Sequence, residues 1–517
     1  MSKSAWDDPR FESRLSHVTL PPELTGVDND RKLLKAVAPL PFELSTLAAA
    51  LALKCSPLSI NQYLRSYARH NVVKSLKSFV ADKHPVIFNA AERYCVETVR
   101  LLLSYEVDPN VEDAHGTPVL NFAIIRSRWT ILNPLEVVKA LLGNGADPHT
   151  IPHDMWIQYI EQPAAEPPPG SKDAGTVVSR TRENRRILAE TLHLNIRYYL
   201  HNASLLYLNK KCAMQLAKTS GFVPLLEVPS LVVSQTYAMQ LIVSTISAHI
   251  GMNIKSPLVF SFAGHSGHGK TEVGKWMGQL LGLNMTIIDC SHVQHTSELL
   301  GASLGYKDSE KPSQLNKFLV ENNGKRSVVF LYEFDKTAEE VLDALLVPLD
   351  SGDYHSRVTN EYIDCSKMVW ILATNLGDQV ITRFHENNMV DQDEEGKAKV
   401  PHKLLVKQLR DVYRERFGAP IVGRIKKIAP FYPFDPNEQA VITHKFLLDL
   451  TDKFRKPIDV SPEVSRLIGH THLAIKNDGE LCSHIAKNEY HTRLGALAQS
   501  CRRYDPMRLL HSVCCHG

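Results

Sequence analysis

Residues 264–272 read GHSGHGKTE, and the spacing GxxxxGK[ST] within them is typical of loops that bind nucleotide phosphates. The glycines let the backbone turn its N–H groups toward phosphate oxygens without a side-chain clash. Lys270 is expected to contact the β- and γ-phosphates, and the Thr271 hydroxyl is expected to bind Mg²⁺. The predicted site consists of Gly264, His265, Ser266, Gly267, His268, Gly269, Lys270, Thr271 and Glu272.

The segments on either side of this loop have the patterns that such a site requires. Residues 256–263, SPLVFSFA, form a short apolar run with the β-branched and aromatic content of a buried strand. Residues 272–282, EVGKWMGQLLG, are amphipathic with helical periodicity. A strand, a glycine loop and a helix therefore follow one another in the order that phosphate binding needs, and we expect ATP and Mg²⁺ as cofactors.

Two polar residues follow other apolar runs farther along the chain. Glu333 comes directly after SVVFLY, and Asn375 directly follows WILAT. Nucleotide hydrolysis needs one group that polarises a water and another that holds this water and the γ-phosphate, and these side chains have the required chemistry. A single Asn is more often a turn residue, so the order of the segments decides the interpretation.

Residues 228 to about 500 resemble the second ATPase domain of ClpB-type disaggregases, which belong to the Clp/Hsp100 family. Eight segments occur in the order of that family. They are LVVSQ (231–235), GHSGHGKTE (264–272), IIDCSHV (287–293), LLGASLGYKD (299–308), SVVFLYEFDK (327–336), WILATNLGD (370–378), FGAPIVGRIKKIAPFYPF (417–434) and YHTRLGAL (490–497). The resemblance implies an α/β AAA+ domain with a phosphate-binding loop, followed by a helical lid.

This resemblance implies roles around the nucleotide for four residues. Val232 and Val233 would line the adenine pocket. Glu333 would polarise the attacking water, and Asn375 would help to hold that water and the γ-phosphate. The expected activity is therefore ATP hydrolysis.

Three further residues carry what the resemblance implies about assembly and substrate. Arg424 would act as an arginine finger in the site of the next subunit, and Arg493 would report the nucleotide state to the lid. Tyr306 would contact a polypeptide threaded through a central pore, because an aromatic ring offers broad apolar contact. The family thus implies a homo-oligomeric ring, expected to be a hexamer, that unfolds or disaggregates misfolded or aggregated proteins.

One residue departs from the family pattern. Tyr332 stands directly before Glu333, where the family has an Asp whose charge supports Mg²⁺. Because tyrosine offers one neutral oxygen and more bulk, we expect nucleotide binding to persist and hydrolysis to be slowed about 10- to 100-fold. Two alternatives stay open: an ATP-binding interaction protein whose nucleotide state controls assembly, and a protein in which the ATPase fold is only a scaffold.

A repeat precedes the ATPase segment. His84-Pro85 and Thr117-Pro118 lie 33 residues apart (117 − 84), and similar helical segments follow each pair. This spacing is that of ankyrin repeats, although a generic pair of helical hairpins is the simpler alternative. The arrangement resembles the ankyrin-containing ClpB homologues and implies an unidentified protein partner for this all-α domain.

These observations predict five parts of the chain. They are a helical region with a candidate degenerate repeat (1–83), ankyrin repeats (84–160), a linker and helical segment (161–227), the large ATPase domain (228–430), and a small lid domain with a tail (431–517).

Composition limits the other functions. A formal net charge of +3 and the absence of a basic stripe argue against nucleic acid as a partner. The apolar run at 45–53 is too short to cross a bilayer, so no membrane partner is expected. Nine cysteines without a CxxC motif and an acid-containing amino terminus favour the cytoplasm. Import by an unusual signal stays open, because the animal homologues with this architecture are mitochondrial.

Overall fold

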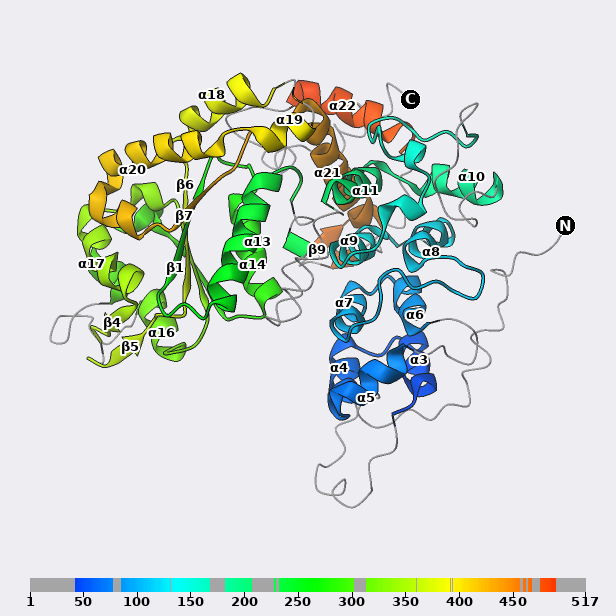
Figure 1. The fold of residues 1–517 in the computed structure, drawn as a ribbon, viewed down its shortest axis with the longest axis horizontal. Coiled ribbons are helices and arrows are strands. Elements are labelled where there is room, and N and C mark those ends of the chain that lie inside the picture. The colour runs from blue at the N-terminus through cyan, green and yellow to red at the C-terminus, as the bar shows by residue number, and fades with distance from the viewer. Residues whose placement is uncertain are drawn as a thin grey trace, which may run out of the picture. The chain divides into compact units, whose positions relative to one another are not determined.

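The structure is a computed structural model, and it divides into two compact units, Met1–Met214 and Gln215–Gly517. Among the described residues, the first unit is helical and the second has a parallel sheet covered by helices (Figure 1). The residues that the structure describes are 42–77, 85–130, 132–167, 182–206, 227–228, 232–301, 313–358, 360–390, 392, 394–455, 459–461, 464–466 and 475–489.

The first unit is built from pairs of short helices. Its α-helices are α3 (Leu44–Ala52), α4 (Pro57–Arg65), α5 (Arg69–Leu76), α6 (Val86–Glu92), α7 (Val96–Ser104), α8 (Val119–Arg126), α9 (Leu135–Gly143), α10 (Arg182–Thr191) and α11 (Leu194–Leu206). α6 and α8 begin 33 residues apart (119 − 86), each directly after a proline. The additional residues of the second pair include a 3₁₀ turn, η2 (Ser127–Trp129), between α8 and α9.

Hydrogen bonds join the turns that end successive helix pairs. The Asn110 side chain donates to the carbonyl of Gly145 at 2.9 Å and accepts from the N–H of Asp147 at 2.7 Å. Within the turn that precedes α8, Oδ1 of Asp113 accepts from two backbone N–H groups, each at 2.8 Å. This repetition agrees with the 33-residue period, and the assignment of the pairs to ankyrin stays a prediction.

Helices α10 and α11 belong to this first unit, and they pack on α8 and α9. Arg185 of α10 is buried and forms an ion pair with Asp154, and Nε of Arg197 in α11 donates to the carbonyl of Tyr159 at 2.8 Å. Part of the predicted 161–227 segment therefore extends the helical unit.

The second unit contains a five-stranded parallel sheet in the order β2-β3-β6-β1-β7. Its strands are β1 (Leu258–Ala263), β2 (Met285–Asp289), β3 (Val328–Tyr332), β6 (Val369–Thr374) and β7 (Lys427–Pro430). β1 and β6 are buried along their whole length, as strands covered on both faces must be. The apolar runs that predicted the strands before Glu333 and Asn375 are β3 and β6.

Alternate residues of the strands pack into two different cores. Leu258, Phe260 and Phe262 of β1 pack with α13 (Thr236–Gly251) and α14 (Lys270–Leu281) on one face. Val259 and Ala263 pack with α17 (Glu339–Asp350) and α20 (His402–Arg424) on the other. This period of two fixes which side chains of each strand face which helices.

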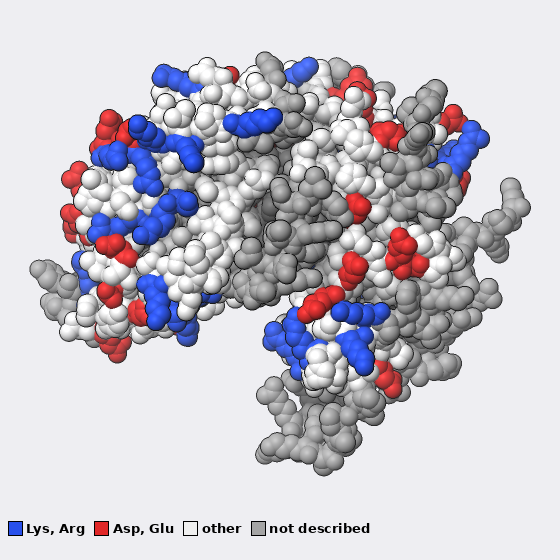
Figure 2. Space-filling view, in the orientation of Figure 1, with Lys and Arg blue, Asp and Glu red and all other residues white. Residues whose placement is uncertain are grey.

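The surface side of α20 is charged. Its residues Leu405, Leu409 and Tyr413, spaced by four, are buried in the core. On the face in Figure 2, Lys and Arg side chains gather at the upper left, where α20 lies in Figure 1, with Asp and Glu side chains beside them. Gly418 interrupts the helix with a φ of +74°, so the turn that bears Arg424 forms a separate short segment.

Smaller elements complete the second unit. They are α15 (Thr296–Leu300), α16 (Gln314–Glu321), α18 (Asp378–Asn388), α19 (Glu394–Lys399), α21 (Pro436–Arg455), α22 (Asp478–Glu489), the hairpins β4 (Asp353–His355) with β5 (Tyr362–Asp364) and β8 (Asp459–Ser461) with β9 (Val464–Arg466), and the 3₁₀ turns η7 (Cys290–His292) and η8 (Phe334–Lys336). Within the described part of the chain, no helix combines the length and apolarity of a membrane span.

Candidate nucleotide site

The register of the sheet brings the predicted site residues to one edge. Ala263 at the end of β1 pairs with Thr374 at the end of β6, and Leu331 near the end of β3 pairs with Leu372. The residues that follow these strands therefore lie at the same edge. Carboxyl ends of parallel strands are where ligands bind in open α/β sheets.

The phosphate-binding loop needs glycine at two positions for different reasons. At Gly264, a Cβ atom would lie 2.5 Å from the carbonyl oxygen of Phe431, so a side chain is excluded. At Gly269, φ is +93°, and a Cβ would lie 3.3 Å from Cγ1 of Val232. α14 begins directly afterwards at Lys270, so its free N–H groups and positive dipole end face the loop.

Lys270 is held at the centre of the site. Its Nζ donates to the carbonyls of Gly264 at 2.5 Å and His265 at 2.7 Å, and to Oδ1 of Asn375 at 2.9 Å. Burial lowers the pKa of Lys270 to about 8, although the carboxylates of Glu333 and Asp335 raise it. A cation is thus placed between the phosphate-binding loop and the end of β6.

Glu333 and Asn375 contact each other directly. Nδ2 of Asn375 donates to Oε1 of Glu333 at 3.2 Å, and Nζ of Lys336 lies 2.9 Å from Oε2. Asp335 accepts from Oγ1 of Thr374 at 2.7 Å and from the N–H of Asn375 at 3.1 Å. The ends of β3 and β6 are therefore joined by side chains that could hold a water and a γ-phosphate.

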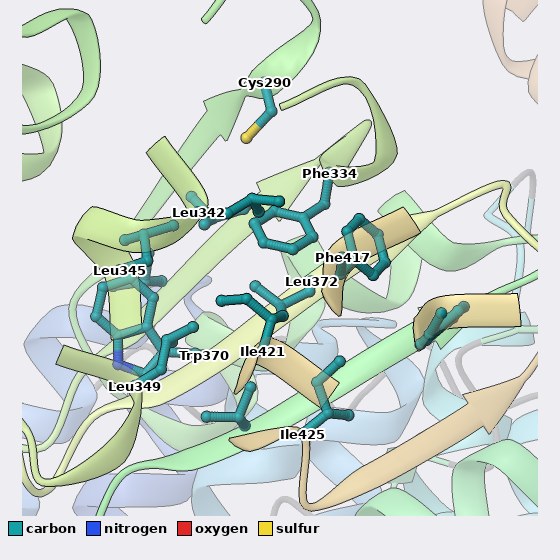
Figure 3. Packing of buried hydrophobic residues seen from close by; sticks show 14 of the residues in the cluster. Cys290, Phe334, Leu342, Leu345, Leu349, Trp370, Leu372, Phe417, Ile421 and Ile425 are labelled. Carbon is teal, nitrogen blue, oxygen red and sulfur yellow. The ribbon is translucent and has the colours of Figure 1, made fainter. Parts of the chain in front are cut away.

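The core below this edge fixes the segment that bears Glu333. Phe334 is fully buried, and its ring centroid lies 5.3 Å from that of Phe417 in α20. Figure 3 shows both rings above Leu372 of β6, with Leu342 of α17 on the far side of Phe334 from Phe417. Arg416 donates to the carbonyls of Asp335 at 2.9 Å and Thr337 at 2.7 Å. This positioning by Arg416 was not predicted, because it acts on backbone atoms.

Tyr332 lies where the family pattern has a carboxylate. Its ring packs on the α14 side of the sheet beside Phe330, with centroids 6.4 Å apart. Burial, followed by hydrogen bonding with Asp289, raises the pKa of Tyr332, so the hydroxyl is neutral near pH 7. Asp289 pairs with Tyr332 across β2 and β3, and its Oδ1 accepts from the N–H of Ser291 at 2.9 Å.

The predicted adenine-pocket residues lie beside the phosphate-binding loop. Val232 and Val233 are both buried, and Val232 approaches Gly269 as described above. Gln235 fixes this segment: its Nε2 donates to the carbonyl of Tyr432 and its Oε1 accepts from the N–H of Tyr432, both at 2.9 Å. The segment before α13 is therefore joined to the residues that follow β7.

The second histidine of the loop is a packing residue. His268 is 1% exposed, and its ring stacks on Phe434 with centroids 5.0 Å apart and an interplanar angle of 20°. Burial lowers the pKa of His268 to about 4, so the ring is neutral near pH 7. The stacking attaches the phosphate-binding loop to the segment that leads into α21.

The fit to ATP and Mg²⁺ is unequal. A loop that excludes side chains, a buried lysine and a helix N-terminus fit a triphosphate. For Mg²⁺, the chain offers the exposed Thr271 and the carboxylate of Glu333, while Tyr332 is neutral. Mg²⁺ bound to nucleotides is usually held by one or two carboxylates together with phosphate oxygens. The residues present therefore fit the nucleotide better than the metal.

One predicted residue, Arg424, is not brought to this site within its own chain, and two others fall outside the part of the chain that the structure describes. Arg424 contacts its own chain elsewhere: Nε donates to the carbonyl of Leu346 at 2.8 Å, and Nη2 lies 3.2 Å from Oδ2 of Asp350. Tyr306 and Arg493 lie outside the described residues. The roles of these three residues stay predictions.

Known proteins resemble part of this chain. Residues 255–428 match the family model of an AAA domain (Cdc48 subfamily). The chaperone ClpB of Staphylococcus epidermidis is 28% identical over 222 residues, which cover 41% of this chain and 24% of that protein. The mitochondrial chaperone ClpB4 of Arabidopsis thaliana is 30% identical over 188 residues, which cover 35% of this chain and 18% of that protein.

Among solved structures, the complex of S. cerevisiae Hsp104 with casein is 21% identical with a TM-score of 0.43, and the match covers 62% of this chain and 52% of that chain. The matching segment spans about a quarter or less of the length of the two curated chaperones. Residues 255–428 therefore contain a parallel α/β sheet and match the model of an AAA domain, and part of the chain is similar to part of the ClpB chaperones.

Proposed function

We propose that this chain hydrolyses ATP and uses the energy to unfold or disaggregate protein substrates. The observation that supports hydrolysis most strongly is the connection of Lys270, Asn375 and Glu333 by hydrogen bonds at one edge of the sheet. These are three of the groups that phosphoryl transfer to water requires. The similarity to ClpB chaperones supports protein substrates as the class on which the energy is used.

Each residue has a distinct task in this proposal. On ATP binding, Nζ of Lys270 turns from the loop carbonyls to the β- and γ-phosphates, and the N–H groups at the start of α14 contact phosphate oxygens. Glu333 accepts a hydrogen bond from the attacking water, and Asn375 holds that water in line. Bound Mg²⁺ would neutralise charge on the β- and γ-phosphates, with Thr271 as its ligand from the chain.

We further propose a ring, expected to be a hexamer, in which Arg424 acts on the site of the neighbouring subunit. In the single chain its guanidinium is held by Leu346 and Asp350, away from the site of its own chain. An arginine supplied from outside stabilises transition-state charge in many nucleotide hydrolases. Tyr306 in the pore loop and Arg493 in the lid would then transmit the cycle to substrate and to domain closure.

The helical unit is proposed to bind a protein partner through ankyrin-type repeats. A pocket of about 650 Å³ supports this proposal, and Trp129 and Leu132 at its border are each about half exposed. Among the described residues that line it, Lys54, Arg93 and Arg126 are basic and Glu92 is the one acid. A partner segment that carries apolar and acidic side chains fits this lining.

The proposed hydrolysis is tested by phosphate release from ATP, with the full chain and the Glu333→Gln variant. We expect sustained release by the wild type and its loss in the variant, while both bind ATP, because glutamine cannot accept the proton of the water. Release that continues unchanged in Glu333→Gln would show that another group or a contaminant is responsible.

A second candidate function is favoured by Tyr332. If its neutral hydroxyl deprives Mg²⁺ of support, ATP binds and is not turned over, and nucleotide state controls assembly alone. Tight binding without phosphate release, together with a mass in solution that changes with ATP, would select this candidate.

A further inference from the structure

The phosphate-binding loop is joined to helix α18 by His265. Nδ1 of His265 lies 3.1 Å from Oδ2 of Asp378, and Nε2 lies 2.8 Å from Oγ1 of Thr382. The His265 side chain is 12% exposed, so water competes little for these contacts. Both polar atoms of the ring are thus used in contacts to one helix. A loop residue that only contacted phosphate through its backbone would not need them.

The donor in the contact with Thr382 follows from chemistry. The Thr382 hydroxyl donates its one hydrogen to the carbonyl of Asp378, one turn earlier in α18, at 3.0 Å, so it accepts a hydrogen bond from Nε2 of His265. Nδ1 of the same ring lies at ion-pair distance from the Asp378 carboxylate. Asp378 and Thr382 are therefore held together by a hydrogen bond, and both contact the imidazole of His265.

Helix α18 begins close to Asn375 and is firmly placed. Asp378 is its first residue, three positions after Asn375. Gly377 has a φ of +83°, and a Cβ there would lie 2.5 Å from Cδ2 of Leu409 in α20. Asp335 fixes the other side of this segment through the N–H of Asn375. A contact on Asp378 therefore acts on the same short segment that carries Asn375.

Lys270 cannot maintain this connection through the reaction. Its Nζ holds Oδ1 of Asn375 at 2.9 Å, yet the same ammonium is the group that must turn to the phosphates. The contact between His265 and Asp378 does not use Lys270, so the turning of Lys270 to the phosphates does not itself break it. It then keeps the loop that holds the phosphates in register with the side chain that holds the water.

We propose that His265 is a positioning residue that acts through Asp378 to align Asn375 with the bound phosphates. This inference rests on the proposed ATP hydrolysis and adds a residue to it. Its effect falls on turnover rather than on affinity. The side chain of His265 contacts α18, and only the backbone carbonyl of His265 contacts Lys270. Misplacement of a reacting group by about 1 Å can slow a reaction by about 10²-fold.

The first experiment compares kcat and KM for ATP in His265→Ala, His265→Asn and His265→Gln. We expect the alanine variant to lose about tenfold or more in kcat with KM changed by less than about twofold. The asparagine amide occupies the place of Nδ1 and can donate to Asp378, so it should restore much of kcat. Glutamine, whose amide is closer to the place of Nε2, should restore less. His355→Ala, an exposed histidine on β4, is the matched control and should equal the wild type.

The second experiment does not depend on turnover. Hydrogen exchange of the backbone amides in 375–382 is measured with saturating ATP, in the wild type and in His265→Ala. We expect faster exchange in the variant, because its loop no longer restrains α18. ATP binding measured on the same samples shows that both are folded and occupied.

The outcomes separate this inference from the proposed function. If the wild type releases no phosphate, the proposal of ATP hydrolysis is wrong. The comparison of hydrogen exchange then decides the role of His265 alone. If the wild type is active and His265→Ala keeps its kcat, or changes only KM, the inference is wrong and hydrolysis stands. Equal exchange in the two ATP-bound proteins also overturns it.

Discussion

Nucleotide binding should weaken as pH rises, because the charge on Lys270 is lost. Burial lowers the pKa of Lys270 to about 8 from an ordinary value of 10.5, although nearby carboxylates raise it. The Lys270 side chain attracts phosphate only in its charged, protonated form, so binding of ATP above pH 8 requires uptake of a proton. The perturbation is a rise in pH from about 7 to about 9, a range in which the phosphates of ATP stay ionised because their last pKa is near 6.

The magnitude follows from the pKa. With a value of about 8, about nine tenths of the lysine is charged near pH 7 and about one tenth near pH 9. If only the charged form binds, the Kd for ATP rises about tenfold, or about 1.4 kcal/mol. Without nucleotide, the free energy of unfolding has the opposite pH dependence to the affinity for ATP, because it increases as pH rises. The contribution of the depressed lysine pKa to this free energy is present above pH 10.5 and is lost as pH falls through 8.

The assay is a titration with a fluorescent ATP analogue at constant ionic strength and saturating Mg²⁺. Lys270→Arg is the matched control, because arginine stays charged throughout this range and its Kd should not rise. If the arginine variant does not bind at all, calorimetry in buffers of different ionisation enthalpy measures proton uptake by the wild type instead. A wild-type Kd that is constant with pH, without proton uptake, would refute the reasoning.

Three further predictions concern the metal, the packing and the assembly. Tyr332→Asp should raise phosphate release about 10- to 100-fold at limiting Mg²⁺, and a variant no faster than Tyr332→Phe would count against the missing carboxylate. Gly274→Ala should lower the free energy of unfolding by about 1–3 kcal/mol in urea titrations, because its Cβ would lie 2.4 Å from the buried Phe330 ring, whereas Gly251→Ala, with nothing within 4 Å, should not destabilise. Arg424→Ala should slow release about 10³-fold, and mixing it with Lys270→Ala should restore turnover above the sum of the two; no restoration would contradict a shared site.

The strands and the loop were predictable because their signals are local. β1, β3 and β6 are apolar runs that end in the site, and the glycines of 264–272 mark the loop without reference to any other part of the chain. Once these strands lie parallel, Glu333 and Asn375 must meet at one edge. The resemblance to ClpB-type proteins placed the same residues in the same order.

The contacts that fix the site were not predictable from local pattern. His265 and Thr382 are 117 residues apart, and Gln235 and Tyr432 are 197 apart. Either histidine of the loop could have faced solvent, and only the fold shows that one binds α18 and the other stacks on Phe434. Arg424 is a different case, because the role predicted for it involves a second copy of the chain, whereas the single chain holds it against Leu346.

Equilibrium dialysis of ATP against the full chain, at millimolar Mg²⁺, tests the central claim most directly. The site described here predicts one ATP retained per chain and loss of that binding in Lys270→Ala, with the circular dichroism of the fold unchanged. A wild-type chain that retains no ATP, or a Lys270→Ala chain that retains as much as the wild type, would contradict the proposed nucleotide site.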